Sequence, residues 1–231
     1  MSGWLVGLPF TSAPIAYFLA RDHGLDFAAS AAAGTMAGAI SQAAFCVAYA
    51  RLARRAAWPI AVAGGCAAFA VATVVLAAVT PGLPAVAALV LLALFGAWRL
   101  MPGDRTARAV VTPPPAWDLP ARMTIATAFV VALTGLAAAL GPRLTGLLAP
   151  FPLYAAILTV FAHALDGAVA ATSVLRGLVL GLAAFAAFFL VLAATLGHGI
   201  APAFALATLV ALALQAASLG LLRRREWHRP C

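Results

Sequence analysis

Long hydrophobic stretches follow one another along the whole chain, and short polar segments separate them. Each stretch has about 20 residues, which is enough for a helix to cross the roughly 30 Å hydrocarbon core of a bilayer. A helix is the expected form because it satisfies its own backbone hydrogen bonds in lipid. We therefore expect an all-α polytopic membrane protein with about eight transmembrane helices, at about 3–20, 28–50, 58–79, 83–100, 123–141, 144–162, 168–196 and 200–222.

The longest polar segment lies between the fourth and fifth stretches and carries the run Pro113-Pro114-Pro115. Proline has no backbone donor and favours extended chain, so this segment is expected to be a stiff linker. The chain then divides into a first membrane repeat (1–101), a cytoplasmic Pro-rich linker (102–122) and a second membrane repeat with a short basic cytoplasmic tail (123–231).

The positions of the arginines predict how the helices are oriented. With both termini on one side, that side receives twelve of the fourteen basic residues, and only Arg21 and Arg143 fall on the other. Cytoplasmic loops are enriched in basic residues, so both termini are expected in the cytoplasm. All basic residues are arginine and alanine is abundant, which is typical of a GC-rich bacterial genome. The bacterial inner membrane is therefore the expected location.

Composition excludes several classes of protein. The chain is 65% hydrophobic and only 9% charged, and its mean hydropathy is +1.07, too apolar for a soluble domain of this length. The net charge of +8 is better explained by arginines at anionic lipid than by nucleic acid. The three cysteines show no metal-ligand or disulfide spacing. We expect no cofactor, metal or nucleic acid; the expected partners are the bilayer and a small molecule, with a homodimer left open.

Two of the hydrophobic stretches are interrupted by proline at corresponding places. Pro9 and Pro14 interrupt the first stretch, and Pro150 and Pro152 interrupt the sixth. A pair of interrupted membrane segments in the two halves of a chain is the best sequence pointer to a transporter's binding site. The sequence therefore predicts that helices 1 and 6 are broken.

Further matches indicate that the halves are duplicated. The signature His-x-Leu-Asp recurs at 23–26 and 163–166, and the pattern Ser-x3-Gly-x3-Gly-x6-Phe recurs at 30–45 and 173–188. The separations are 140 and 143 residues, close to the 141 between Pro9 and Pro150. One broken segment is the first span of the chain and the other is the sixth. Because they are five spans apart, an odd number, they cross the membrane in opposite directions. The prediction is a pair of inverted repeats.

The interrupted segments also suggest candidate substrate-binding residues. Proline frees backbone carbonyls, which in lipid require a polar partner or a wet cavity. The alternative is a pair of kinked helices that neighbours satisfy. Arg176 lies about two turns into the seventh stretch, where a charge is costly, and it is either functional or a cytoplasmic anchor. The candidates are Pro9, Thr11, Ser12, Pro14, Gln42, Pro150, Pro152, Tyr154 and Arg176.

The two His-x-Leu-Asp signatures are candidates for proton coupling. They place His23 with Asp26, and His163 with Asp166. A histidine with a reference pKa of roughly 6.5 beside a carboxylate is able to load and release a proton. The alternative is that each aspartate caps the helix that follows it.

Taken together, the patterns predict a secondary transporter, or permease, that moves a small molecule by alternating access with proton coupling. No catalytic motif is present in the sequence, so we expect no enzymatic activity. Two alternatives stay open: an interfacial lipid or polyprenyl-phosphate enzyme, and a channel or non-catalytic membrane subunit.

Overall fold

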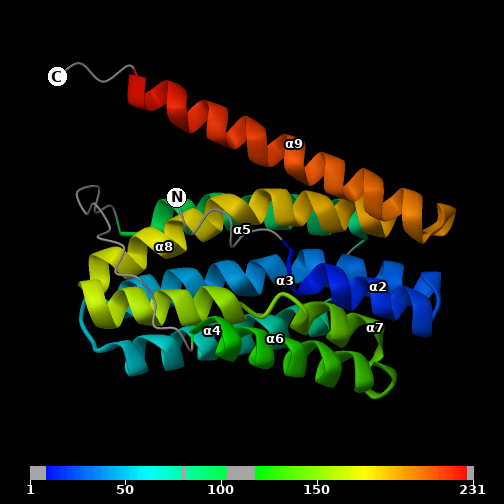
Figure 1. Ribbon diagram of the computed structural model, residues 1–231, viewed down its shortest axis with the longest axis horizontal. Helices are drawn as coiled ribbons and strands as arrows, with labels where there is room; N and C mark the ends of the chain where they lie inside the picture. Colours follow the sequence, from blue (N-terminus) through cyan, green and yellow to red (C-terminus); the bar gives the residue numbers. More distant parts are fainter. Residues whose placement is uncertain (1–8, 80–81, 103–117, 228–231) are drawn as a thin grey trace.

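The computed structural model describes residues 9–79, 82–102 and 118–227, which form helices joined by short turns (Figure 1). No β-strand occurs within these ranges. In chain order the elements are α2 (Ser12–Asp22), α3 (Leu25–Leu52), α4 (Trp58–Ala78), α5 (Leu83–Leu100), α6 (Asp118–Gly135), α7 (Ala137–Leu148), α8 (Leu153–Thr195), the 3₁₀ turn η1 (Leu196–His198) and α9 (Ile200–Trp227).

Five of the described helical segments are long and apolar enough to cross a membrane, which fits a helical membrane protein. They are Leu25–Leu52, Trp58–Ala78, Leu83–Leu100, Leu153–His198 and Ile200–Ser218. The first predicted span falls partly on residues 1–8, outside the described part, and α2 forms its second half. The predicted linker also falls mostly outside the described residues. In its last residues α6 begins, at Asp118.

Helix α3 lies at the centre of the bundle (Figure 1) and contacts α2, α4, α5, α7 and α8. In its most apolar window 67% of residues are buried, against 22% in α4, α5 and α9. Helix α3 is rich in alanine and glycine, and small residues let neighbouring helices approach closely in lipid. The outer helices instead present large apolar side chains on their exposed faces, among them Val74, Leu92 and Leu209.

Two glycines with positive φ separate a short helix from a long core helix. Gly24 (φ 90°) lies between α2 and α3, and Gly167 (φ 84°) divides α8 into segments 153–166 and 168–195. Glycine adopts this conformation readily because it has no Cβ. The two turns are 143 residues apart, the separation already found between Ser30 and Ser173.

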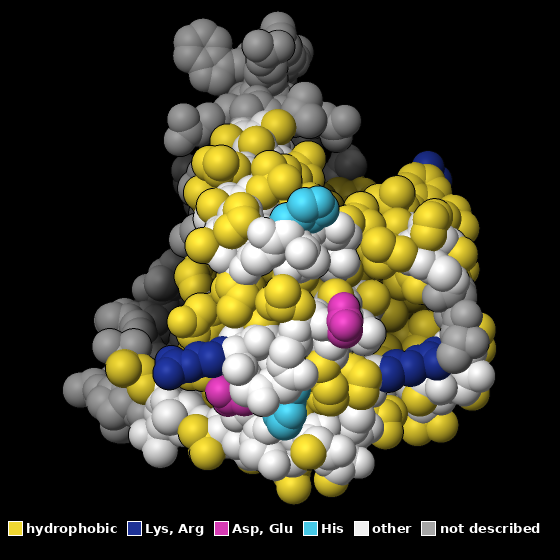
Figure 2. Space-filling view, turned by 90° about the vertical axis from the view of Figure 1, so that its right-hand side faces the viewer, with side chains coloured by type: hydrophobic (Ala, Val, Ile, Leu, Met, Phe, Trp, Pro, Cys, Tyr) yellow, Lys and Arg dark blue, Asp and Glu magenta, His cyan; other side chains and the backbone are white. Residues whose placement is uncertain are grey.

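The end of the molecule where α2 turns into α3 carries charged and histidine side chains (Figure 2). Figure 2 shows basic, acidic and histidine side chains spread over this end, with hydrophobic surface around them. Charged and polar groups at helix ends, with apolar sides between, are typical of a protein that crosses a membrane.

Candidate functional site

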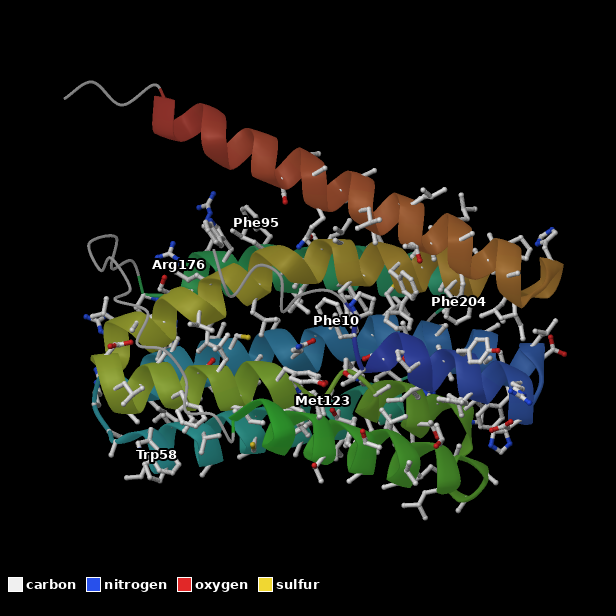
Figure 3. All side chains as sticks on the ribbon, in the orientation of Figure 1. Phe10, Trp58, Phe95, Met123, Arg176 and Phe204 are labelled. Carbon is white, nitrogen blue, oxygen red and sulfur yellow. The ribbon has the colours of Figure 1, made fainter. Side chains whose placement is uncertain are left out.

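The two proline interruptions meet inside the bundle. Ser12, at the start of α2, donates a hydrogen bond from its Oγ to the carbonyl oxygen of Ala149, 2.9 Å away. Ala149 directly follows the end of α7, and the Ser12 side chain is buried. Phe10, labelled in Figure 3, marks the first interruption about midway along the bundle. Two segments 137 residues apart in sequence therefore share one buried polar contact.

The second interruption is short and partly satisfied by its own backbone. The Phe151 amide donates to the Leu148 carbonyl at 3.0 Å, and the Ala156 amide donates to the Pro152 carbonyl at 2.6 Å as α8 begins. Pro150 and Pro152 donate no such bonds because proline has no N–H. The carbonyl of Ala149 takes its side-chain partner from Ser12, so one freed carbonyl of the second break is satisfied by a residue beside the first.

Within the described residues, Pro14 does not itself interrupt α2. Pro14 lies in the first turn of α2, where an amide has no carbonyl four residues earlier in the helix to bind. The helix passes through it, with the Ala13 amide donating to the Pro9 carbonyl at 2.9 Å. In the described part of the chain the first interruption consists of the non-helical residues 9–11, and Thr11 precedes α2 without a side-chain cap.

The stripe of small residues on α3 packs against the second interruption. A Cβ atom added to Gly34 would lie 2.9 Å from the carbonyl oxygen of Arg143, and one added to Gly38 would lie 2.9 Å from that of Leu147. A Cβ on Gly38 would also overlap the ring of Pro150. Close packing is the role predicted for this stripe, and its partner is α7 together with the break that follows it.

Two buried polar atoms lack a hydrogen-bond partner in the described part of the chain: Oε1 of Gln42 and Oγ1 of Thr159. The exposed fraction is 6% for Gln42 and 0% for Thr159. Gln42 continues the Gly34–Gly38 stripe of α3 by one turn, and Thr159 lies in the segment of α8 that follows the second interruption. A buried polar group without a partner costs about 1–3 kcal/mol. Two helices that contact each other, α3 and α8, thus each carry one buried polar atom with unfilled hydrogen-bonding capacity.

Tyr49 and His163 join the same two helices further along. The Tyr49 hydroxyl lies 3.3 Å from His163 Nδ1, and the two rings meet edge to face at 5.9 Å. Tyr49 is fully buried, and His163 is half-buried. On the sequence alone Tyr49 is one more aromatic residue in an apolar helix. Its proximity to a residue 114 positions away follows only from the fold.

The two His-x-Leu-Asp signatures do not occupy equivalent positions. His23 directly precedes its turn glycine and stacks on Phe27 at 4.8 Å, whereas His163 lies four residues before Gly167. Asp26 lies in the first turn of α3, after its turn. Asp166 lies just before the other turn. When Gly24 is aligned with Gly167, His23 corresponds to Asp166 and not to His163. The repeated signature is therefore shifted by three residues relative to the repeated glycine turn.

Arg176 contacts the end of α5 and not the interruptions. Its Nη1 donates to the carbonyl oxygen of Pro102 at 2.9 Å, and its guanidinium lies 4.9 Å from the centre of the Trp98 ring (Figure 3). The helical segment that carries Arg176 begins at residue 168, so Arg176 lies about two turns into it, and its side chain reaches the C-terminal end of α5. Tyr154, in contrast, lies in the first turn of α8 beside the second interruption.

Among the residues that the structure describes, no group of three or more His, Cys, Asp or Glu side chains is placed to hold a metal ion. No protein-family model matches the chain, and comparison with curated proteins and with solved structures found no similar protein. A function for the protein therefore has to be inferred from the geometry of the interruptions.

Proposed function

We propose that the protein is a secondary transporter that moves a small molecule by alternating access across the bacterial inner membrane. The observation that carries this proposal is the Ser12–Ala149 hydrogen bond, which joins the two interrupted helices inside the bundle. Interrupted helices that meet at mid-membrane provide free backbone groups and hydroxyls at one point, which is how many transporters bind substrate.

The repeated geometry supports inverted repeats. In each half a proline interruption is followed by a short helix, a positive-φ glycine and a long core helix. With eight spans and cytoplasmic termini, these halves run in opposite directions through the membrane. The short helices of each half would then open the site alternately to the two sides.

The unpartnered oxygens of Gln42 and Thr159, on α3 and α8, are buried and available as further acceptors for a substrate. We assign the substrate site to Ser12, Gln42, Thr159 and the backbone from Ala149 to Pro152. Arg176 is omitted from this site because its partners lie at the end of α5. His163 keeps its assignment as the proton-coupling residue, with Tyr49 as its partner.

Single cysteines test the proposal in a chain whose own three cysteines are replaced by alanine. The informative positions are 12, 26, 152 and 166, and the probe is a membrane-impermeant thiol reagent. We expect position 26 to react from outside and position 166 from the cytoplasm. Positions 12 and 152 should react from either side, in proportions that change with the state of the transporter.

The alternatives from the sequence give other results. An interfacial enzyme predicts that positions 26 and 166 react from the same side and that 12 and 152 stay unreactive. A channel predicts that 12 and 152 react from both sides at once. Either pattern would overturn the transporter proposal.

A further inference from the structure

Two cavities follow the edge between α3 and α5, one after the other. The first has a volume of about 390 Å³ and is lined by α3 residues from Ser30 to Ile40, together with the ends of α4, α5 and α7. The second has a volume of about 510 Å³ and is lined by α3 from Ile40 to Arg51 and by α5 from Ala93 to Leu100. Ile40 lines both, so the cavities together cover most of the length of α3.

Each cavity is apolar along its length and has an arginine at its outer end. Arg143 lines the first cavity and Arg51 lines the second. Ser30 and Arg51 are 21 residues apart on one helix, which corresponds to about 32 Å at 1.5 Å per residue. That length is close to the roughly 30 Å hydrocarbon thickness of a bilayer. Arg51 therefore lies at the depth of one head-group layer. Arg143, whose backbone lies against Gly34, is near the other, within reach of the head groups for a long arginine side chain.

Neither arginine is neutralised by a carboxylate from the cavity walls. No acidic residue is among the described residues that line either cavity. Arg143 donates from Nη2 to the Leu76 carbonyl at 2.7 Å, and Arg51 donates from Nε to the Leu100 carbonyl at 3.4 Å. A guanidinium has five N–H donors in a fixed fork, so each keeps donors for an anion.

The first cavity is open towards the surrounding lipid. Leu89, which lines it, is 44% exposed, and Ser30 at its end is exposed as well. An apolar cavity open to the bilayer favours an alkyl chain, because an empty cavity would leave its lining side chains without van der Waals partners. A guanidinium at the end favours phosphate, with which it forms paired charge-assisted hydrogen bonds.

We propose that these cavities bind anionic phospholipids, one from each leaflet, with an acyl chain along α3 and the phosphate on Arg143 or Arg51. This inference does not depend on transport activity. A chain in the first cavity would contact both α3 and α7, the helices that frame the second interruption. Bound lipid is therefore expected to stabilise the folded bundle.

The test compares phosphatidylglycerol with phosphatidylcholine of the same acyl chains, added to the full-length protein in detergent. One readout is the rise in melting temperature over each variant's own baseline. The second is the number of lipid molecules retained per protein, measured by native mass spectrometry. We expect phosphatidylglycerol to raise the melting temperature more and to be retained at two molecules per protein.

Variants separate the head group from the acyl chain. Arg143→Gln and Arg51→Gln should each reduce the retained phosphatidylglycerol from two molecules to one. Ala33→Phe and Gly96→Phe, which fill the cavities, should each remove one molecule of either lipid. Arg21→Gln, at an exposed arginine outside both cavities, is the matched control and should change nothing.

The proposal is overturned if both arginine variants keep two molecules of phosphatidylglycerol, or if the wild-type chain retains the two lipids equally. It is also overturned if the cavity-filling variants retain as much lipid as the wild type. Because each lipid effect is measured against the variant's own baseline, reduced stability of a variant does not hide the result.

Discussion

The contact between α3 and α7 makes a prediction about Gly34. An alanine Cβ at this position would lie 2.9 Å from the Arg143 carbonyl oxygen, 3.2 Å from the Gly146 Cα and 3.4 Å from the Leu147 amide nitrogen. All three atoms belong to the backbone, so no side chain is able to rotate away. The two helices must separate by a few tenths of an ångström along the contact.

The expected cost follows from these distances. Adding a methyl group to a tightly packed interior costs about 1–3 kcal/mol. Alanine recovers up to about 1 kcal/mol of this, because it is a better helix former than glycine. Gly34→Ala should therefore lower the free energy of unfolding by about 1–2 kcal/mol, which for a chain of this size is a fall in melting temperature of roughly 2–8 °C.

Gly96 provides the matched control within the same bundle. It lies inside α5, and an added Cβ there would meet nothing within 4 Å. Gly96→Ala should gain the helix preference without any clash, so its melting temperature should stay level or rise by up to roughly 4 °C. The two substitutions are chemically identical and differ only in what the new methyl group meets.

The assay is thermal unfolding of purified protein in one detergent, followed by the loss of the monodisperse peak in size-exclusion chromatography. Wild type and both variants are measured together. If Gly34→Ala proves as stable as Gly96→Ala, α3 and α7 do not pack backbone to backbone, and the position assigned to the second interruption is refuted.

Three further predictions test other contacts. The double variant Ser12→Cys, Ala149→Cys should form a disulfide under mild oxidation, seen as faster migration in non-reducing gels. If no disulfide forms in the folded protein, the two interruptions do not lie side by side. Cys46 is fully buried, so in a chain without other cysteines it should react with a maleimide, followed by mass spectrometry, only after denaturation; reaction in folded protein would contradict the packing of α3. Tyr49→Phe removes the hydroxyl that meets His163 and should lower stability by about 1 kcal/mol in the same thermal assay. An unchanged melting temperature would show that this pair contributes nothing to the fold.

Hydrophobicity alone predicts most of the helices. The stretches predicted at 58–79 and 83–100 agree with α4 and α5 to within one residue, because each ends at residues that stop a membrane helix. The stretch predicted at 168–196 also agrees with the segment 168–195 that follows Gly167. The stretches predicted at 123–141 and 144–162 do not match single helices, because hydropathy does not register the turns that separate α6, α7 and the segment 153–166.

The candidate site is predictable only in part, because local patterns identify breaks but not partners. The prolines indicate where backbone groups are freed, yet nothing in the sequence shows that Ser12 reaches Ala149. The repeated signature around His23 and His163 also misleads, because its three matching residues lie at non-equivalent positions around two equivalent glycine turns. Partners such as Tyr49 depend on which helices the fold brings together.

The short helices have an unusual mechanical property. Helix α2 has non-helical residues at both ends, around Phe10 and at Gly24, and the segment 153–166 likewise lies between Pro152 and Gly167. A short helix with non-helical residues at both ends is able to tilt through changes in a few backbone dihedral angles at those ends, and none of its internal hydrogen bonds has to break. Each half of the molecule therefore contains one lever of 11 to 14 residues, and both levers start from the point where Ser12 meets Ala149.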